Sequence, residues 1–254
     1  MFSATTYNIL AQAYCRPERY RGVPETALER TARRRRLLDR IAALNTDLLC
    51  LQEVEPDALD AIRATLPHHD AHFLQKRDKP DGVATLYRRD RFALRDFTEI
   101  HYDAIEPGYD HVGLILELTL DGLPIAIGNT HLRWQKRETP AKDHLGRLQF
   151  LELLERMPNG ARLIAGDFNA GHDSLVLREG RSVGLAMGGC ALRPWDTALI
   201  NGNRRKLDYL LYSESLFRPT PRPLPQLSRH APIPDLVEPS DHLPLSVDFE
   251  LGRA

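Results

Sequence analysis

The sequence has little of what marks secreted, membrane-spanning or zinc-thiolate proteins. Its 254 residues include only three cysteines, Cys15, Cys50 and Cys190, an odd number without the paired spacing of a disulfide framework or a zinc knuckle. No apolar run approaches the roughly 20 residues that cross a bilayer, and no basic region followed by an apolar stretch begins the chain. We therefore expect a cytoplasmic protein without a membrane partner.

An excess of charge of one sign is also missing. The chain has 34 Lys and Arg against 35 Asp and Glu, for a formal net charge of −1. Proteins that wrap long nucleic acid usually carry a basic excess, because their affinity comes from phosphate neutralisation. The charge balance therefore disfavours long duplex nucleic acid as the partner. Only five of the basic residues are lysines, and arginine suits bidentate phosphate contacts, although genome composition also produces such a bias.

In other respects the composition is that of an ordinary folded protein, with 42% hydrophobic and 27% charged residues. The length fits one mixed domain, so we expect residues 1–254 to form a single domain. Short apolar segments predict strands at Ala4–Leu10, Asp47–Val54, Val83–Tyr87, Gly113–Leu120, Pro124–Thr130, Arg162–Gly166, Leu207–Tyr212 and Leu245–Leu251. Helical spacing predicts helices at Thr26–Leu44, Asp57–Leu66 and Ala141–Met157. This mixture predicts the α+β class, with sheets covered by helices.

Three local patterns add detail to this prediction. Asp121-Gly122 lies between two apolar segments and is typical of a hairpin turn. Proline is so dense in Phe217–Pro239 that the segment cannot be a helix or a central strand, so we expect a loop or a sheet edge. The run Arg33–Arg36 falls in the first predicted helix, where consecutive side chains point in different directions, and we expect it to be mainly a solvated face.

Polar side chains end many of the apolar segments. They are Asn8, Glu53, His131, Asp167 and Asn169. Asp208 lies inside the apolar segment Leu207–Tyr212, and the pair Asp241 and His242 comes just before the last apolar segment. Any one of them is more often a turn or cap residue than a functional one. Glu53 is harder to explain in that way, because Leu49 and Leu51 share its side of the strand and an uncompensated carboxylate there costs free energy. So many polar ends on different segments indicate one site built from the ends of a sheet.

The residue types in this set suit a hard divalent cation. Glu53, Asp241 and Asn8 offer oxygen ligands without thiolate, the donor set that Mg²⁺ or Mn²⁺ prefers. A Mg²⁺ ion held by few carboxylates takes phosphate oxygens as further ligands. Two histidines and a further aspartate could then orient water, move a proton or stabilise phosphate charge. The reaction class that this pattern predicts is metal-assisted hydrolysis of a phosphoester.

Six short motifs in a fixed order carry a family resemblance over most of the chain, from Thr6 to Leu251. They are Tyr7-Asn8-Ile9-Leu10-Ala11-Gln12, Leu51-Gln52-Glu53-Val54, Asp81-Gly82-Val83-Ala84, Asn129-Thr130-His131-Leu132, Gly166-Asp167-Phe168-Asn169 and Ser240-Asp241-His242. The chain resembles the endonuclease/exonuclease/phosphatase superfamily with its DNase I-like fold, and within it the deadenylase/nocturnin/Angel-like branch. The resemblance implies a four-layer α/β/β/α sandwich of two packed mixed, mainly antiparallel sheets, with the active site at one rim.

The resemblance also implies roles for the metal-binding residues. Glu53 would be the principal Mg²⁺ or Mn²⁺ ligand, with Asn8 close by and Asp241 completing or bridging the metal site. Whether one metal ion acts or two is left open.

By the same resemblance, five residues would carry the chemistry. Asp167 would orient or deprotonate the attacking water, and Asn169 would hold that water or the phosphate. His242 would stabilise the phosphate or transfer a proton, with Asp208 setting its tautomer. His131 would contact the scissile phosphate from the other side.

Substrate contacts are expected after His131. Arg133, Lys136 and Arg137 are candidates for backbone-phosphate contact, and Trp134 matches an aromatic residue of the deadenylases. Those enzymes place a proline and a phenylalanine to sandwich adenine where this chain has Lys136 and Asn203. A base-stacking clamp of that kind is therefore not expected here.

These observations lead to a main hypothesis and several alternatives. The main one is a Mg²⁺-dependent phosphodiesterase, an exonuclease on single-stranded RNA or oligonucleotides, with no obvious protein partner. The first alternative keeps the fold but is a phosphatase or cyclic phosphodiesterase acting on RNA 2′,3′-cyclic phosphate ends, nucleotides or another small phosphoester. A DNA endonuclease and a non-catalytic binding module are the further alternatives.

Overall fold

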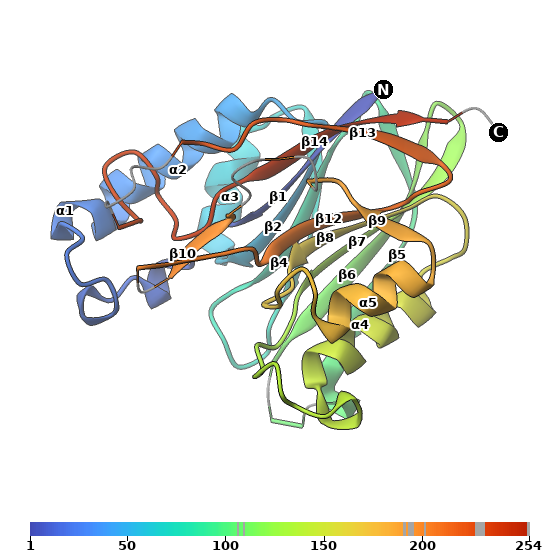
Figure 1. The fold of residues 1–254 in the computed structure, drawn as a ribbon. Coiled ribbons are helices and arrows are strands. Elements are labelled where there is room, and N and C mark those ends of the chain that lie inside the picture. Colours follow the sequence, from blue (N-terminus) through green and yellow to red (C-terminus); the bar gives the residue numbers. More distant parts are fainter. Residues whose placement is uncertain are drawn as a thin grey trace.

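Two six-stranded sheets pack face to face in the computed structural model, and helices cover the outer face of each (Figure 1). The structure describes residues 1–105, 107–108, 110–189, 192, 196–200, 202–226 and 232–252. The four layers run helix, sheet, sheet, helix, so the α/β/β/α sandwich that the resemblance implies is confirmed. Whether the whole of residues 1–254 is one domain stays a prediction.

The first sheet has the order β13-β14-β1-β2-β4-β3. Its strands are β1 (Phe2–Asn8), β2 (Leu48–Val54), β3 (His69–Gln75), β4 (Gly82–Arg88), β13 (Phe217–Pro221) and β14 (Leu245–Leu251). Only β1 and β2 pair in parallel; the other pairs in this sheet are antiparallel. The proline-rich segment thus begins as β13 at the sheet edge, where a missing backbone N–H is tolerated, as expected.

The second sheet has the order β5-β6-β7-β8-β12-β9. Its strands are β5 (Phe92–His101), β6 (Val112–Leu120), β7 (Leu123–His131), β8 (Arg162–Asp167), β9 (Leu185–Met187) and β12 (Asp208–Ser213). The pair β7 and β8 is parallel and the rest are antiparallel. A separate hairpin joins β10 (Ala198–Ile200) to β11 (Asn203–Arg205). The expected mixture of mainly antiparallel pairs is confirmed.

Successive side chains of β6 point to opposite faces of the sheet, one toward the core between the two sheets and the next toward the core under the helices. Leu114, Leu116 and Leu118 are buried between the two sheets, whereas Ile115 belongs to the cluster under the helices of the second sheet. At the end of β6, Asp121 and Gly122 both have positive φ, 52° and 82°, as a tight hairpin turn requires. The hairpin predicted from Asp121-Gly122 is confirmed.

Helices cover each sheet through apolar faces. The first sheet is covered by α2 (Arg30–Leu44) and α3 (Pro56–Thr65), the second by α4 (Leu145–Arg156) and α5 (Leu175–Ser182). The short turns of helix are α1 (Glu25–Leu28), η1 (Gln12–Tyr14), η2 (Pro17–Arg19), η3 (Tyr102–Ala104) and η4 (Ala141–Asp143).

Two predicted helices differ from the observed ones at their beginnings. The helix predicted over Thr26–Leu44 is interrupted at Glu29, whose carboxylate accepts hydrogen bonds from the backbone N–H groups of Thr31 and Ala32 and so caps α2. The helix predicted from Ala141 begins at Leu145, because His144 caps it by accepting from the backbone N–H of Arg147. The strands β3, β5, β9, β10 and β11 and the helix α5 were not predicted.

The cysteines fit the expectation of an unpaired set where they can be seen. Cys15 and Cys50 are free thiols, and Cys50 is buried at 1% exposure in the core between the sheets. Cys190 lies outside the described residues. Within the described part of the chain, no helix combines the length and apolar character needed to cross a membrane.

Candidate active site

The polar strand ends converge at one rim of the sandwich. Because β1 and β2 are parallel, and β7 and β8 are parallel, the carboxyl ends of each pair meet at the same edge. Strand register places Asp167 of β8 beside His131 on one side and beside Asp208 on the other. Asn8 from the other sheet reaches across to the same carboxylate, since its Nδ2 lies 3.1 Å from Asp167 Oδ2.

The three predicted metal ligands lie on the first-sheet side of this rim. Asn8 Nδ2 donates to Glu53 Oε1 at 3.0 Å, and the backbone N–H of Ala11 donates to Glu53 Oε2 at 3.1 Å. Asp241 lies in the segment before β14, and its Oδ2 accepts from the hydroxyl of Tyr20 at 3.2 Å. Asn8 therefore joins Glu53 to Asp167 in one continuous cluster.

The electrostatics of Glu53 and Asp241 fit a cation. Burial raises the pKa of both carboxyls, and the charge of Asp241 raises the pKa of Glu53 further. Lys76 acts in the opposite direction on Glu53. The half-buried Glu53 and the buried Asp241 repel each other and offer only oxygen donors, an arrangement that a hard divalent ion would stabilise.

A second group could also bind a metal. Ligand atoms of Asp167, Asp208 and His242 lie within 4.8 Å of one another, and all three side chains are buried. In this structure, however, His242 Nδ1 and Asp208 Oδ2 form a hydrogen bond of 2.8 Å with each other. That bond occupies one potential ligand nitrogen and favours a proton-handling pair over a metal site.

The pair of His242 and Asp208 acts on Asp167. Burial alone would lower the pKa of His242, but the charges of Asp208 and Asp167 outweigh it and raise that pKa well above its usual value. His242 Nε2 lies 3.7 Å from Asp167 Oδ2. Burial raises the pKa of Asp167 to about 7 against the opposing charge of His242, and Asp208 adds to the increase. A carboxyl of this kind suits exchange of a proton near neutral pH.

His131 and Asn169 form the opposite side of the cluster. Asn169 Nδ2 donates to Leu132 O and lies 3.0 Å from His131 Nε2, which therefore accepts and leaves the ring proton on Nδ1. Burial and the nearby Lys76 and His111 lower the pKa of His131 well below its usual value, so the ring is neutral. His131 can thus offer an N–H donor without bringing a charge.

Backbone strain is concentrated at this rim. Leu10, Glu53 and Asn169 have positive φ values of 55°, 56° and 49°. At Glu53 the register of β2 against β4 shifts between Gln52 and Val54, and this irregularity turns the carboxylate out of the regular pleat. Non-glycine residues in this conformation cost free energy and are typical of functional sites.

Two motif residues have a different role from their neighbours. Asn129 on β7 is fully buried, and its Nδ2 donates to Leu51 O at 3.2 Å and Ala84 O at 2.9 Å on the first sheet. Gln52 Nε2 donates to Asn129 Oδ1 at 2.8 Å. These amides join the two sheets directly behind Glu53 and His131, and they position the site without lying in it.

Sequence reasoning missed several residues at the rim. Lys76 and Asp81 form a buried ion pair of 2.5 Å, and the hydroxyl of Tyr14 donates to the same carboxylate at 2.6 Å. Tyr20 contacts Asp241, as described above. Asp81 lies in one of the six sequence motifs but was given no role, and the scarcity of lysine was the one signal for Lys76. Tyr14 ends η1 and Tyr20 follows η2, and neither belongs to a sequence pattern.

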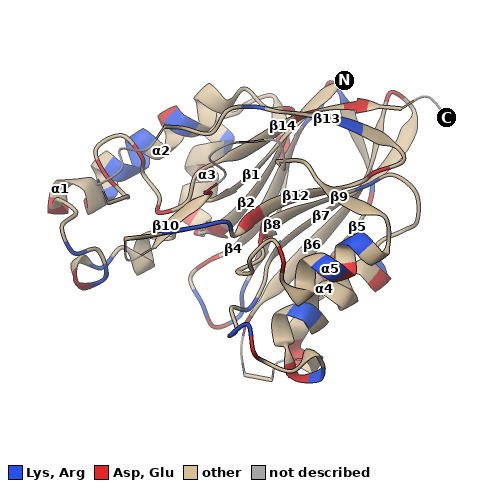
Figure 2. Ribbon diagram, viewed as in Figure 1, with Lys and Arg blue, Asp and Glu red and all other residues tan. Residues whose placement is uncertain are grey.

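The predicted substrate-binding residues follow β7 and lie at the surface. Trp134 is 50% exposed, Lys136 is exposed, and Arg133 is partly buried. Arg137 is exposed and forms an ion pair of 2.6 Å with Asp173. Figure 2 also shows basic residues along β11, which leads into the start of β12 at Asp208.

Fold and site together define a phosphoesterase-like sandwich, and comparison with known sequences identifies the family. The profile of the Endonuclease/Exonuclease/phosphatase family matches residues 5–242, so the chain belongs to this family. It is 28% identical to the CCR4-Not complex 3′-5′-exoribonuclease subunit Ccr4 of Candida albicans, over 69% of this chain and 28% of that protein. It is also 28% identical to nocturnin of Mus musculus, over 97% of this chain and 65% of that protein. The chain thus spans less than two thirds of either relative.

Solved structures have the same fold. The crystal structure of ANGEL2, a 2′,3′-cyclic phosphatase, in complex with adenosine-2′,3′-vanadate matches with a TM-score of 0.80 at 22% identity, covering 98% of this chain and 95% of that one. The human nocturnin catalytic domain with bound sulfate matches with a TM-score of 0.73 at 25% identity, covering 99% and 93%. The resemblance to the deadenylase/nocturnin/Angel-like branch is confirmed by these relatives.

Proposed function

We propose that this protein is a divalent-metal-dependent phosphodiesterase that removes nucleotides from the end of single-stranded RNA or oligonucleotides. The observation that carries the proposal is the contact of Asn8 with both Glu53 and Asp167. It joins a cation-compatible carboxylate to a buried carboxyl with a pKa of about 7. Metal-assisted hydrolysis of a phosphoester needs both groups side by side.

Glu53 and Asp241 would hold Mg²⁺ or Mn²⁺, with Asn8 beside them. When bound, the ion supplies neutralisation of the phosphate charge. The other residues act on the water and the phosphate. Asp167 accepts the proton of the attacking water, and its neighbour Asn169 orients that water or the phosphate.

The two histidines have different roles because they differ in protonation state. His242, held in the charged form by Asp208 and Asp167, donates to the phosphate oxygens or to the leaving oxygen. His131 is neutral and donates from Nδ1, an atom that is buried without a hydrogen-bond partner among the described residues. Donors placed where negative charge develops are worth a large part of the rate of such reactions.

The substrate class is supported by the relatives and by charge. Ccr4, one of the relatives, is named as a 3′-5′-exoribonuclease. The near-neutral net charge disfavours long duplex. Lys136 and Asn203, both exposed, replace the aromatic and proline clamp of the deadenylases, so we do not expect a preference for poly(A). Cys15 and Cys50 are free, which fits a reducing compartment such as the cytoplasm.

A phosphatase acting on 2′,3′-cyclic phosphate ends of RNA or on another small phosphoester is the second candidate. The ion pair between Arg137 and Asp173 favours this second candidate. It occupies one of the few basic side chains that could contact the phosphate backbone of a longer RNA. The name of ANGEL2 describes such an activity.

The test is a panel of end-labelled RNA and DNA oligonucleotides with 3′-hydroxyl, 3′-phosphate and 2′,3′-cyclic phosphate ends, incubated with Mg²⁺ or Mn²⁺. We expect stepwise release of mononucleotides from RNA, and a loss of about 100-fold or more in Glu53→Gln. Glu155→Gln, the same change at an exposed glutamate, is the matched control. Removal of the terminal phosphate alone would support the second candidate. No metal-dependent product from any substrate would contradict both.

A further inference from the structure

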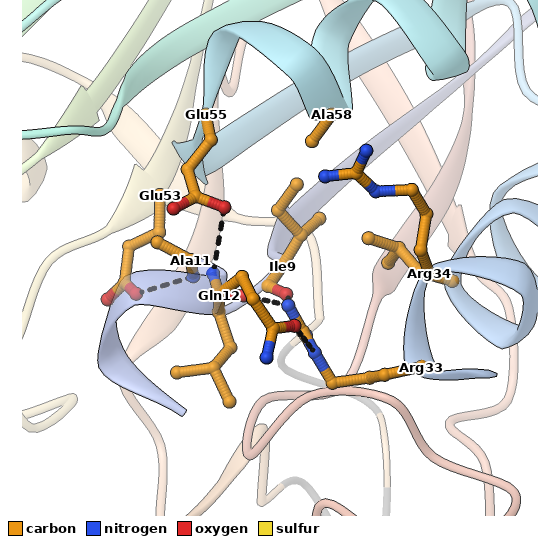
Figure 3. A pocket seen from close by; sticks show the side chains of 10 residues that line it. Ile9, Ala11, Gln12, Arg33, Arg34, Glu53, Glu55 and Ala58 are labelled. Carbon is orange, nitrogen blue, oxygen red and sulfur yellow. Dashed lines mark hydrogen bonds between the residues drawn. The ribbon is translucent and has the colours of Figure 1, made fainter. Parts of the chain in front are cut away.

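Arg33 differs from the other arginines of its run. The sequence predicts a mainly solvated face for Arg33–Arg36, but Arg33 is only 4% exposed. Figure 3 shows its guanidinium pointing from α2 toward Ile9 and Gln12, while Arg34 lies toward Ala58. A buried guanidinium costs free energy unless its donors are satisfied, so its surroundings must provide acceptors.

Four hydrogen bonds satisfy this guanidinium, and all the acceptors are neutral. Nη1 donates to Ile9 O at 3.1 Å and to Pro239 O at 2.9 Å. Nη2 donates to Leu10 O at 2.8 Å, and Nε donates to Gln12 Oε1 at 2.9 Å. The planar fork of arginine can satisfy several carbonyls in fixed directions at once, which the single ammonium of lysine cannot do.

The segments that Arg33 joins are the ones that end in the proposed metal ligands. Ile9 and Leu10 directly follow Asn8, and Leu10 has the strained φ of 55°. The next residue, Ala11, donates its backbone N–H to Glu53.

Pro239 stands two residues before Asp241, on a segment 206 residues away from Arg33. Ser240 adds a second link, since its hydroxyl donates to Asn8 O at 2.8 Å.

We propose that Arg33 is a positioning residue that sets the spacing between the Glu53–Asn8 side and the Asp241 side of the metal site. The expected effect on metal binding rests on the proposed function. The hydrogen bonds by which Arg33 joins residues 9–12 to Pro239 do not depend on it. Loss of the fork lets residues 9–12 and 239–242 move apart. The affinity for the divalent ion then falls, whereas kcat at saturating metal changes less than the metal concentration required for half-maximal rate.

The variants are Arg33→Lys, which keeps the charge, and Arg33→Gln, which keeps two donors without it. Arg34→Lys is the matched control, because Arg34 is the next residue of the same helix and pairs with the exposed Asp57. Binding of Mn²⁺ to the resting protein is measured by electron paramagnetic resonance or calorimetry, without substrate. Amide hydrogen exchange is measured over residues 9–13 and 239–242.

We expect Arg33→Lys to weaken Mn²⁺ binding by about 10–100-fold, the range typical of residues that orient metal ligands. Both segments should lose amide protection together, while Arg34→Lys behaves like the wild type. In the wild-type protein, saturating Mn²⁺ should raise the protection of both segments together, a measurement that needs no variant.

Unchanged Mn²⁺ affinity in folded Arg33→Lys, or loosening of only one segment, would overturn the inference. Wild-type protein that binds no Mn²⁺ would instead refute the proposed function, and the exchange measurement would still decide whether Arg33 joins the two segments.

Discussion

Asp167 lies between two imidazoles that carry opposite protonation states. His131 and His242 place their Nε2 atoms 3.6 Å and 3.7 Å from the same Oδ2. Asp208 raises the pKa of His242, whereas burial and Lys76 lower the pKa of His131. Environments that push the pKa values of similar groups apart assign them to different tasks. At the scale of single residues, the Asp167 carboxyl therefore has a charged imidazole on one side and a neutral imidazole on the other.

The first prediction concerns Asp208→Asn. The substitution keeps the shape of the side chain but removes the charge that holds His242 protonated and the acceptor that orients its ring. We expect kcat to fall by about 10²–10⁴-fold, the range of a lost acid or base, while Mn²⁺ affinity changes little. Steady-state kinetics on the active substrate of the oligonucleotide panel, with a Mn²⁺ titration beside it, measures both quantities. Asp70→Asn, an exposed change, is the control, and wild-type kcat in Asp208→Asn would contradict the assigned role.

At the scale of elements, the sheets are joined by amides as well as by apolar packing. Asn129 of β7 donates to carbonyls of both β2 and β4, and Gln52 of β2 donates back to it. The parallel pairs that build the site belong to different sheets, so this junction sets their relative position.

We predict that Asn129→Leu lowers the free energy of unfolding by about 1–3 kcal/mol, because it removes the acceptor that lies 2.8 Å from the buried Gln52 amide and the donor to Leu51 O and Ala84 O. Urea denaturation measures the loss. Asn159→Ala, an exposed change, should stay within about 0.5 kcal/mol of the wild type. Equal stability of the wild type and Asn129→Leu would show that the amide junction contributes nothing.

Asp47 ties the beginning of β2 to two other elements. Its Oδ2 accepts from the backbone N–H and hydroxyl of Ser3 on β1, and from Arg91 before β5. Burial raises the pKa of Asp47, but these hydrogen bonds outweigh it and leave the pKa below its ordinary value of 3.8. The contribution of Asp47 to stability is therefore present above pH 3.8 and is lost as the pH falls through the lower, folded-state pKa.

The third prediction follows from that sign. Asp47→Asn should be less stable than the wild type at pH 6, and the difference should shrink as the pH falls below about 4. Urea denaturation from pH 2.5 to 6 measures the difference. Asp60→Asn, at a side chain that is 80% exposed, should leave the pH dependence of the wild type unchanged. A constant difference between Asp47→Asn and the wild type at every pH would refute the prediction.

At the scale of the whole molecule, the site spans both sheets and the segment before the last strand. A ligand that binds only the assembled site must therefore stabilise the entire fold. The repulsion between the carboxylates of Glu53 and Asp241 makes a divalent cation such a ligand.

The fourth prediction is that Mn²⁺ or Mg²⁺ raises the Tm in a concentration-dependent manner. At 100 times the Kd, binding adds about 2.7 kcal/mol, which corresponds to about 5–10 °C for a chain of this size. Thermal unfolding followed by circular dichroism, with and without a chelator, measures the shift. Glu53→Gln should lose most of it and Asp173→Asn none. The same shift in Glu53→Gln would exclude Glu53 as a ligand.

Local patterns in the amino-acid sequence were enough to identify the residue types of the site and the class of the fold. Apolar segments that end in Asn8, Glu53 and Asp167 could be recognised because strand patterning and ligand chemistry are both local properties. The α+β class and the β6–β7 hairpin were predictable for the same reason.

Tertiary structure alone decided which of several identical residue types lies where. Arg33 is buried and Arg35 exposed because only Arg33 faces carbonyl groups of Ile9 and Pro239, the second of them 206 residues away. Asn129 joins the sheets while Asn169 lies in the site, although both stand near the carboxyl end of an apolar strand. The free energy of a buried polar group depends on the partners that distant segments bring to it, and no local pattern contains that information.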